Sequence, residues 1–161
     1  VTLSLGYASS IAVVPEGDPQ TSVPGLFLGG EYWARLYSWV NVRAYAGFLA
    51  TSTDQSRCQL AGGCDVSEEV VVLGAKGRLM APIPWVAPFI ELGLGLSIGT
   101  IHATDVGVDR IRHGAVIDLP IGFGLSLGPK HNVDLGAIIL DHGGAEATGA
   151  ALYVGVSLPV P

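Results

Sequence analysis

Charged residues are scarce in this sequence. Asp, Glu, Lys and Arg make up 14% of the 161 residues, whereas an average soluble domain carries about 25%. Hydrophobic residues account for 49% and Gly for 23 positions. A soluble all-β protein of this size needs a charged exterior, and there are too few charges here to cover one. An ordinary soluble surface is therefore excluded.

Long hydrophobic runs are also missing. A membrane-spanning helix needs about 18 or more consecutive apolar residues. The most apolar window, residues 85–101, contains Glu91 and is interrupted by Gly93, Gly95 and Gly99. High hydropathy without a spanning helix leaves two classes of protein, a very apolar soluble sandwich or a membrane β-barrel.

The sequence does contain a strong alternation between hydrophobic and small or polar residues. Between Ile90 and Ile98, every second residue is Leu or Ile, and the residues between them are Glu, Gly, Gly and Ser. This period of two is typical of a β-strand with unlike faces, and no segment has a helical period of 3.6. The pattern predicts eight strands, at about residues 1–8, 25–37, 39–50, 70–80, 89–98, 115–126, 132–140 and 151–158.

The connections between these strands alternate in length. Four long polar stretches, residues 9–24, 51–69, 100–114 and 141–149, are separated by three short turns. In an up-and-down arrangement every long loop then lies at one end, an asymmetry typical of outer-membrane barrels. We predict an all-β fold with one domain over the whole chain, an eight-stranded antiparallel up-and-down transmembrane β-barrel.

The two faces of each predicted strand differ enough to orient the barrel. If the Leu, Ile and Val face contacts lipid, the interior holds small residues and eight charges. These charges are four acids and four bases: Glu31, Arg35, Arg43, Lys76, Arg78, Glu91, Asp118 and Asp134. An eight-stranded barrel is only wide enough for its side chains to fill, so the charges must pair. We expect Glu91 to pair with Lys76 or Arg78, which flank the same turn.

Aromatic residues lie near the predicted strand ends. Tyr37, Trp39 and Trp85 lie near short turns, and Tyr7 and Phe48 lie near long loops. Membrane barrels place aromatic girdles at both membrane interfaces, so these positions agree with a barrel that spans a bilayer.

Two glycine-rich alternating segments carry a resemblance to a known group. They are LGGEY at residues 28–32 and PFIELGLG at residues 88–95. With the strand pattern over the whole chain, the sequence resembles the small eight-stranded outer-membrane barrels of the OmpA/OmpX-like kind. This resemblance implies a location in the outer membrane of a Gram-negative bacterium and contact with its lipid and lipopolysaccharide. It supplies no catalytic motif.

Cys58 and Cys64 form the clearest candidate for covalent chemistry. They lie six residues apart in a long, Gly-containing loop of a chain expected to be exported, which favours a disulfide. A metal site would need further Cys or His residues nearby. The histidines His102, His113 and His142 lie in long loops, and we expect them to be ordinary loop residues. We predict no catalytic, metal or cofactor site.

The predicted long loops are acidic. They hold ten acidic and three basic residues, a net charge of −7, which argues against nucleic acid as a ligand. The acids are Glu16, Asp18, Asp54, Asp65, Glu68, Glu69, Asp105, Asp109, Asp141 and Glu146; the bases are Arg57, Arg110 and Arg112. We expect these loops to face the outside of the cell and to contact surface or envelope proteins, while the short turns face the periplasm.

Four functions remain open at this point. The leading hypothesis is a non-enzymatic barrel that presents extracellular loops in a structural or interaction role, alone or as a subunit of a larger surface assembly. The second is a lipid A-modifying outer-membrane hydrolase. The third is a narrow porin-like channel, which interior bulk such as Trp33, Arg43 and Phe89 disfavours. The fourth is a soluble lipocalin-like barrel that binds an apolar ligand.

The disulfide can be tested directly. Peptide mapping of the folded protein without reduction should recover Cys58 joined to Cys64, because the short, flexible spacer lets the two thiols meet. Recovery of two alkylated free thiols from the unreduced protein would refute the bridge.

Overall fold

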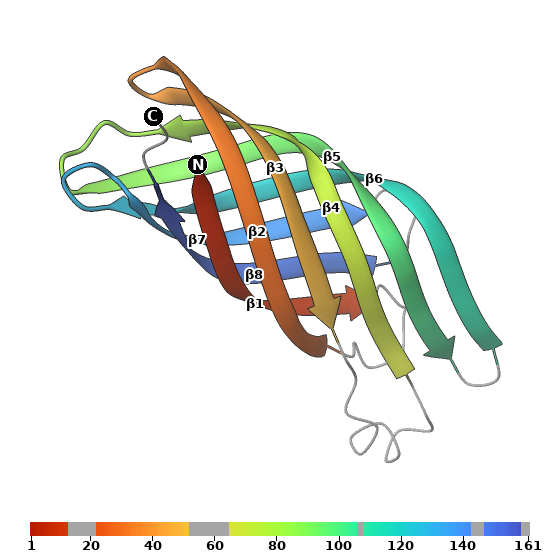
Figure 1. The fold of residues 1–161 in the computed structure, drawn as a ribbon. Coiled ribbons are helices and arrows are strands. Elements are labelled where there is room, and N and C mark those ends of the chain that lie inside the picture. Colours follow the sequence, from red (N-terminus) through yellow and green to blue (C-terminus); the bar gives the residue numbers. More distant parts are fainter. Residues whose placement is uncertain (13–21, 52–64, 106–107, 143–146, 159–161) are drawn as a thin grey trace.

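Eight antiparallel strands form the whole described structure. The computed structural model describes residues 1–12, 22–51, 65–105, 108–142 and 147–158. The strands are β1 (Thr2–Ala12), β2 (Ser22–Tyr37), β3 (Val40–Thr51), β4 (Asp65–Met80), β5 (Val86–Asp105), β6 (Val108–Leu127), β7 (Val133–His142) and β8 (Ala147–Ser157). Each strand pairs with the next, and β8 pairs with β1 (Figure 1). The predicted all-β, closed eight-stranded barrel is confirmed.

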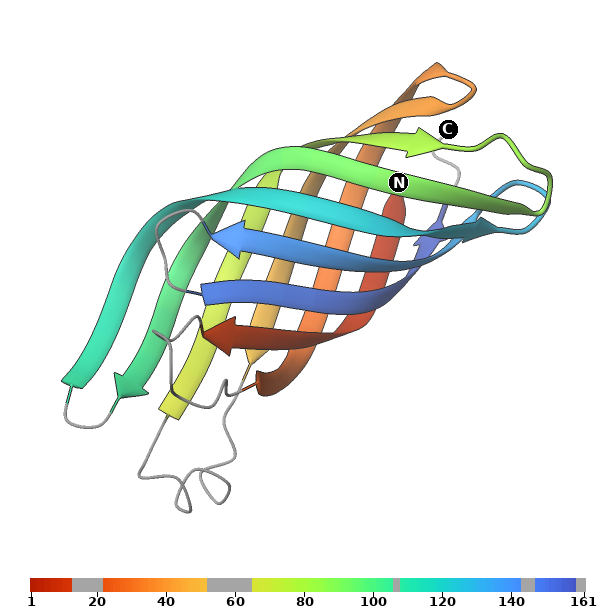
Figure 2. The ribbon, with the colours of Figure 1, turned by 180° about the vertical axis from the view of Figure 1, so that it is seen from behind.

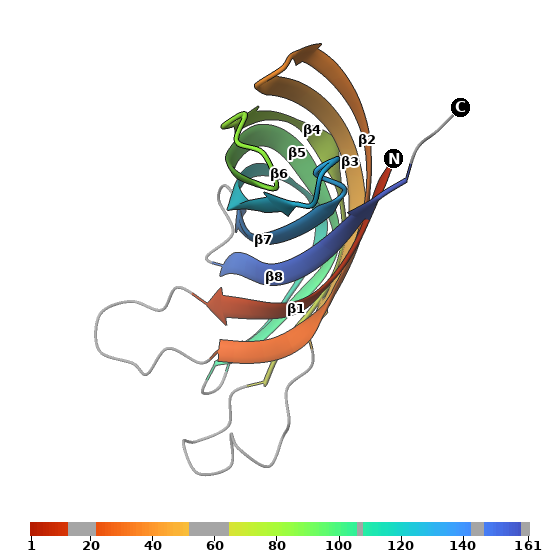
Figure 3. The ribbon, with the colours of Figure 1, turned by 90° about the vertical axis from the view of Figure 1, so that its left-hand side faces the viewer.

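Pairing between the first and last strands closes the barrel. The ladder of β1 and β8 runs from Thr2 opposite Ser157 to Ala12 opposite Ala147. It is extended at its end by a backbone bond from the Leu158 N–H to the Val1 oxygen, 2.7 Å long. Figure 3 shows the strands curving around a common interior. The described residues contain no helix that is long and apolar enough to cross a membrane.

Short turns gather at one end of the barrel. They connect β2 to β3, β4 to β5 and β6 to β7, and β1 begins and β8 ends at the same end (Figure 1). Two turns dock on each other, because the Gly128 N–H donates to the Trp85 oxygen and an imidazole nitrogen of His131 lies 2.9 Å from the Ile83 oxygen. Gly128 has a φ of 92°, a conformation that glycine adopts at little cost.

The strands near the other end are longer than the sequence pattern predicts. Residues 100–114 were expected to form a long loop, but β5 continues to Asp105 and β6 begins at Val108. Ladder pairing persists up to Asp105 opposite Val108. The alternation of apolar and small or polar residues stops before these strands end. A strand segment with both faces outside lipid needs no such pattern. Figure 2 shows β4, β5 and β6 reaching beyond β7, β8 and β1 at this end.

Large apolar side chains cover the outer wall. Along β5 and β6 they include Leu92, Leu94, Ile117 and Phe123, each more than half exposed. Among the outward positions of the strands whose side chains the structure describes, a charge occurs only where the band ends near the loops, at Glu69 and at Asp141. In water this surface would be a very large apolar patch. It matches the lipid-facing band of a membrane barrel.

Aromatic side chains mark both margins of this band. Tyr37, Trp39 and Trp85 are exposed at the turn end, and Tyr7 and Phe48 are exposed toward the loop end. The rings of Tyr37 and Trp39 stack with centroids 6.2 Å apart. This arrangement places aromatic residues where the two membrane interfaces are expected.

The outer wall can be tested with one substitution at two depths. Leu94 is 63% exposed in the middle of the band, and Leu36 is 58% exposed at the tip of the β2–β3 hairpin. Leu94→Arg should cost about 2–4 kcal/mol of unfolding free energy in lipid vesicles, whereas Leu36→Arg should cost about 0–1 kcal/mol, because a guanidinium is penalised most at mid-membrane. Equal costs for the two variants would contradict a lipid-facing wall.

Candidate functional site

Charged side chains gather inside the turn-end half of the barrel. Glu31 of β2 binds two cations from the next two strands: its carboxylate oxygens lie 2.6 Å from Arg43 Nη1 of β3 and 2.6 Å from Lys76 Nζ of β4. Arg43 and Lys76 are direct cross-strand partners, so the sheet register brings both cations to Glu31. All three residues are at least 90% buried.

Glu91 of β5 forms the centre of the other half of this network. It lies 2.6 Å from Lys76 Nζ and 2.5 Å from Arg78 Nε, and Arg78 is its direct cross-strand partner. Arg78 also donates to Asp134 of β7 at 2.7 Å, and the Ser126 hydroxyl donates to the same carboxylate at 2.6 Å. Lys76 therefore links Glu31 to Glu91, and Arg78 links Glu91 to Asp134.

Six of the eight predicted interior charges form this charge network, which we define as Glu31, Arg43, Lys76, Arg78, Glu91 and Asp134. Its three acids and three bases balance. Burial of these groups is costly, and the direct pairs offset that cost. A balanced, closely paired network serves structure, because the network itself has no net charge that would attract an ion.

Asp118 lies apart from this network. It is fully buried and accepts a hydrogen bond from the Ser97 hydroxyl of β5. The prediction from the charged residues did not include Ser97 and Ser126 as partners. Their inward position in the alternating pattern was the available signal, since an inward Ser close to an inward Asp has few other partners.

Arg35 departs from the prediction, since it is exposed. β1 pairs with β2 only as far as Glu31, so the end of β2 is held by β3 alone and projects beyond the barrel wall. The register between β2 and β3 also shifts between Arg35 and Tyr37. The Arg35 guanidinium instead lies 5.9 Å from the Trp33 ring centroid, and Arg35 belongs to none of the ion pairs that define the charge network.

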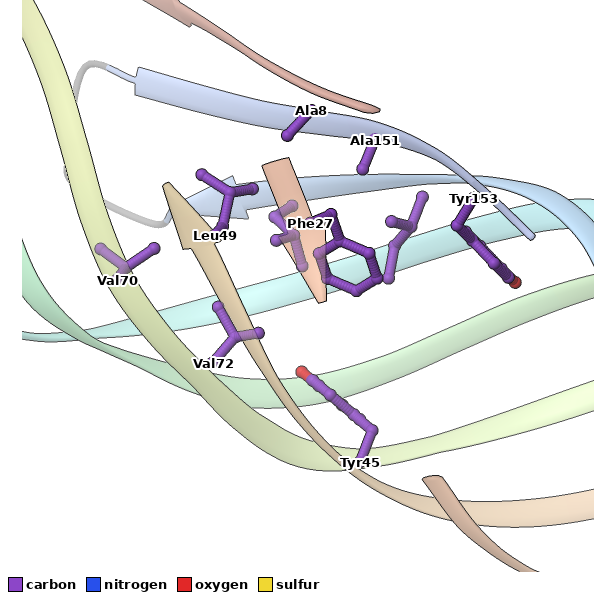
Figure 4. Close-up of a cluster of buried hydrophobic side chains, with 10 residues drawn as sticks. Ala8, Phe27, Tyr45, Leu49, Val70, Val72, Ala151 and Tyr153 are labelled. Atoms are coloured by element: carbon purple, nitrogen blue, oxygen red, sulfur yellow. The ribbon is translucent and has the colours of Figure 1, made fainter. Parts of the chain in front are cut away.

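Apolar clusters lie on both sides of the charge network. Met80, Ala87 and Phe89 are buried toward the turns. Toward the loops a larger cluster fills the barrel (Figure 4), with Phe27, Leu49 and Val70 among its buried members. A space of about 10 Å³ remains beside Tyr45 and Tyr153, about the volume of one water probe. The described side chains in this part of the interior are therefore closely packed.

The described residues show no metal centre. No group of three or more His, Cys, Asp or Glu side chains among them is placed to hold a metal ion. His131 bonds to a backbone oxygen in a turn. Cys58 and Cys64 lie outside the described residues, so the disulfide stays a prediction.

Comparisons with known proteins agree with this architecture. No protein-family model and no curated protein sequence matches the chain. Among solved structures it is similar to Neisserial surface protein A, with 17% identity, a TM-score of 0.61, and coverage of 96% of this chain and 94% of that chain. It is also similar to Ail, the attachment invasion locus protein of Yersinia pestis, with 17% identity, a TM-score of 0.57, and coverage of 96% and 93%.

A third similar structure is that of the outer membrane enzyme PagL, with 15% identity, a TM-score of 0.53, and coverage of 95% of this chain and 99% of that chain. The chain therefore has the fold of the small eight-stranded outer-membrane barrels, and the resemblance seen in the sequence is confirmed at the level of the fold. Identities this low leave the function open, because one fold hosts many functions.

The charge network can be tested with a pair of matched substitutions. Glu91→Ala leaves Lys76 and Arg78 without their shared carboxylate, so it should destabilise the barrel by about 3–5 kcal/mol. Glu69→Ala makes the same chemical change at an exposed position of β4 and should cost less than about 0.5 kcal/mol. Urea unfolding in lipid vesicles measures both. A Glu91→Ala midpoint equal to that of the unmodified protein would show that Glu91 contributes no stabilising pair.

Proposed function

We propose that this chain is a non-enzymatic barrel of a bacterial outer membrane that presents its loop end outside the cell as an interaction surface. The apolar outer wall with aromatic margins supports the membrane location. The filled interior leaves the two ends of the barrel as the surfaces through which it meets other molecules. The two ends differ, since short turns close one and long strands and loops extend from the other.

The single observation that carries the interaction role is a sheet that projects at the loop end. We call it the projecting sheet and define it as residues 65–69 of β4, 100–105 of β5 and 108–114 of β6. β5 and β6 pair throughout this region. β7 pairs with β6 only from Asp118 onward, so no described strand lies on the other side of residues 108–117. A partner's extended segment binds to such an edge through backbone hydrogen bonds.

Charge narrows the class of partner. The four long segments at the loop end carry a net charge of −7. They are residues 9–24, 51–69, 100–114 and 141–149. Acidic surfaces attract basic partners and repel polyanions. Ail has been crystallised with the heparin analogue sucrose octasulfate; for this chain we propose instead a basic protein segment, or lipopolysaccharide bridged by divalent cations.

Three other functions remain as alternatives with distinct tests. A lipid A hydrolase, for which PagL shows that the fold can carry an enzyme, would change the mass of lipid A in cells that produce the chain. A channel would conduct ions in a planar bilayer, but the filled interior disfavours this function. A soluble lipocalin-like barrel would stay folded and monodisperse without detergent or lipid, but the apolar outer wall disfavours this function.

The orientation of the barrel is tested by cysteine labelling of intact cells. In a Cys58→Ser, Cys64→Ser background, Val108→Cys at the tip of the β5–β6 hairpin should react with a membrane-impermeant maleimide. Pro129→Cys, in the turn between β6 and β7, should react only after the outer membrane is permeabilised. The opposite order would contradict the proposed orientation.

The interaction role is tested in the same cells by shortening the hairpin. Ile101 and Arg112 are cross-strand partners, so replacing residues 102–111 with Asn-Gly closes the hairpin with a favoured two-residue turn. The shortened barrel should fold as before and lose the surface proteins that cross-link to the unmodified chain. An unchanged set of cross-linked proteins would contradict a role for the projecting sheet.

A further inference from the structure

The outer wall contains a groove at the turn end of β3, β4 and β5. It measures about 470 Å³ and is lined by outward side chains of Trp39, Leu79, Ala81, Pro82, Pro88 and Ile90. None of these side chains is charged, and none but the indole carries a polar atom. We call this feature the turn-end groove. Its position on the outer wall separates it from the charge network, which lies inside.

Small and compact side chains create the groove. Ala81 and the two prolines, Pro82 and Pro88, share the lining with the bulkier Trp39, Leu79 and Ile90. Backbone hydrogen bonds fix the strands beneath, with the Met80 N–H donating to the Trp39 oxygen at 2.9 Å and the Ala81 N–H donating to the Pro88 oxygen at 3.0 Å. The floor is thus part of the ladder, and the walls cannot close by moving the strands together.

The groove is continuous with the lipid-facing band. Leu79 and Ile90 belong to that band, with exposed fractions of 46% and 59%. Trp39 stacks on Tyr37 at the aromatic margin, so the groove opens where acyl chains meet lipid headgroups. The exposed charged side chains described at the turn end, Arg35 and Lys130, are both cationic, which complements a phosphate.

We propose that the turn-end groove holds one acyl chain of a glycerophospholipid from the leaflet at the turn end. This inference rests on the proposed membrane location. A groove in a hydrocarbon environment must be filled, because walls without neighbouring atoms lose their dispersion contacts. A flexible acyl chain fits a rigid apolar groove between fixed strands, and its phosphate then lies at the level of the aromatic margin, near the cationic end of the barrel.

A second groove on the outer wall provides a control. It measures about 500 Å³, and Ala137 of β7 lies in it between Phe123 and Leu152. Its lining also includes Leu5, Tyr7 and Leu135 and contains no tryptophan. A substitution that fills it tests whether any change to the lipid-facing wall alters the signal from Trp39.

Tryptophan fluorescence in vesicles with brominated acyl chains tests the proposal, since bromine quenches on close approach. The variant Trp33→Phe, Trp85→Phe retains only Trp39, and the variant Trp33→Phe, Trp39→Phe retains only Trp85, which is 64% exposed at the same margin but outside the groove lining. Each barrel is folded into phosphatidylcholine vesicles with a rising fraction of brominated lipid.

We expect both tryptophans to be quenched. Quenching of Trp39 should rise linearly with the fraction of brominated lipid, because a single acyl chain occupies the groove. Quenching of Trp85 should follow a curve, because several exchanging lipids surround it. Adding Ala81→Leu, which fills the turn-end groove, should remove most of the quenching of Trp39 and leave that of Trp85 unchanged. Adding Ala137→Leu should change neither signal.

Three results would overturn the proposal, and they are distinguishable. Quenching of Trp39 that survives Ala81→Leu means that no chain occupies the groove. Quenching of Trp85 without quenching of Trp39 means that protein, such as a second copy of this chain, covers the groove. In both cases the membrane location stands. Absence of quenching at both tryptophans places the barrel outside the bilayer and removes the proposed function as well.

Discussion

The need to pair every backbone polar group within the hydrocarbon governs this structure. Lipid offers no hydrogen bonds, so a sheet that crosses it cannot have free edges. The ladder between β1 and β8 meets this requirement by joining the first strand to the last. Closure with eight strands then sets the interior width, which is enough for packed side chains and too small for a lumen.

Closure also dictates where the charges lie. A strand places successive side chains on opposite faces, and here the outer face contacts lipid, so polar and charged residues along the spanning segments must point inward. There they are far from water, and burial would destabilise the fold if any remained unpaired. The charge network meets this constraint with short contacts, among them Lys76 between Glu31 and Glu91. Apolar clusters separate the network from both ends of the barrel, and burial strengthens its ion pairs.

These constraints explain which features the sequence alone could predict. Along the middle of the strands the alternation is strong, so strand number, the two faces and the pairing of Glu91 with Lys76 or Arg78 follow from the pattern. Outside the bilayer the constraint ends. Residues 100–105 and 108–114 form strands without a clear alternation, and Arg35 has inward parity yet is exposed, because β2 outruns β1 there. The hydrogen bond from Ser97 to Asp118 could not be predicted from the pattern, because it depends on the three-dimensional register of the strands.

The same division, between residues inside and outside the bilayer, indicates where function is expected in this fold. Residues within the lipid-facing part are committed to closure, burial and packing, and variation there costs stability. Beyond the membrane the strands are released from these demands, and β4, β5 and β6 extend unequally, leaving one side of β6 without a described partner strand. Proteins with similar barrels include an outer membrane enzyme and an attachment invasion locus protein. The same scaffold therefore carries different activities. Specificity in this chain is therefore expected at the projecting sheet and the loops between its strands, where sequence can change without opening the barrel.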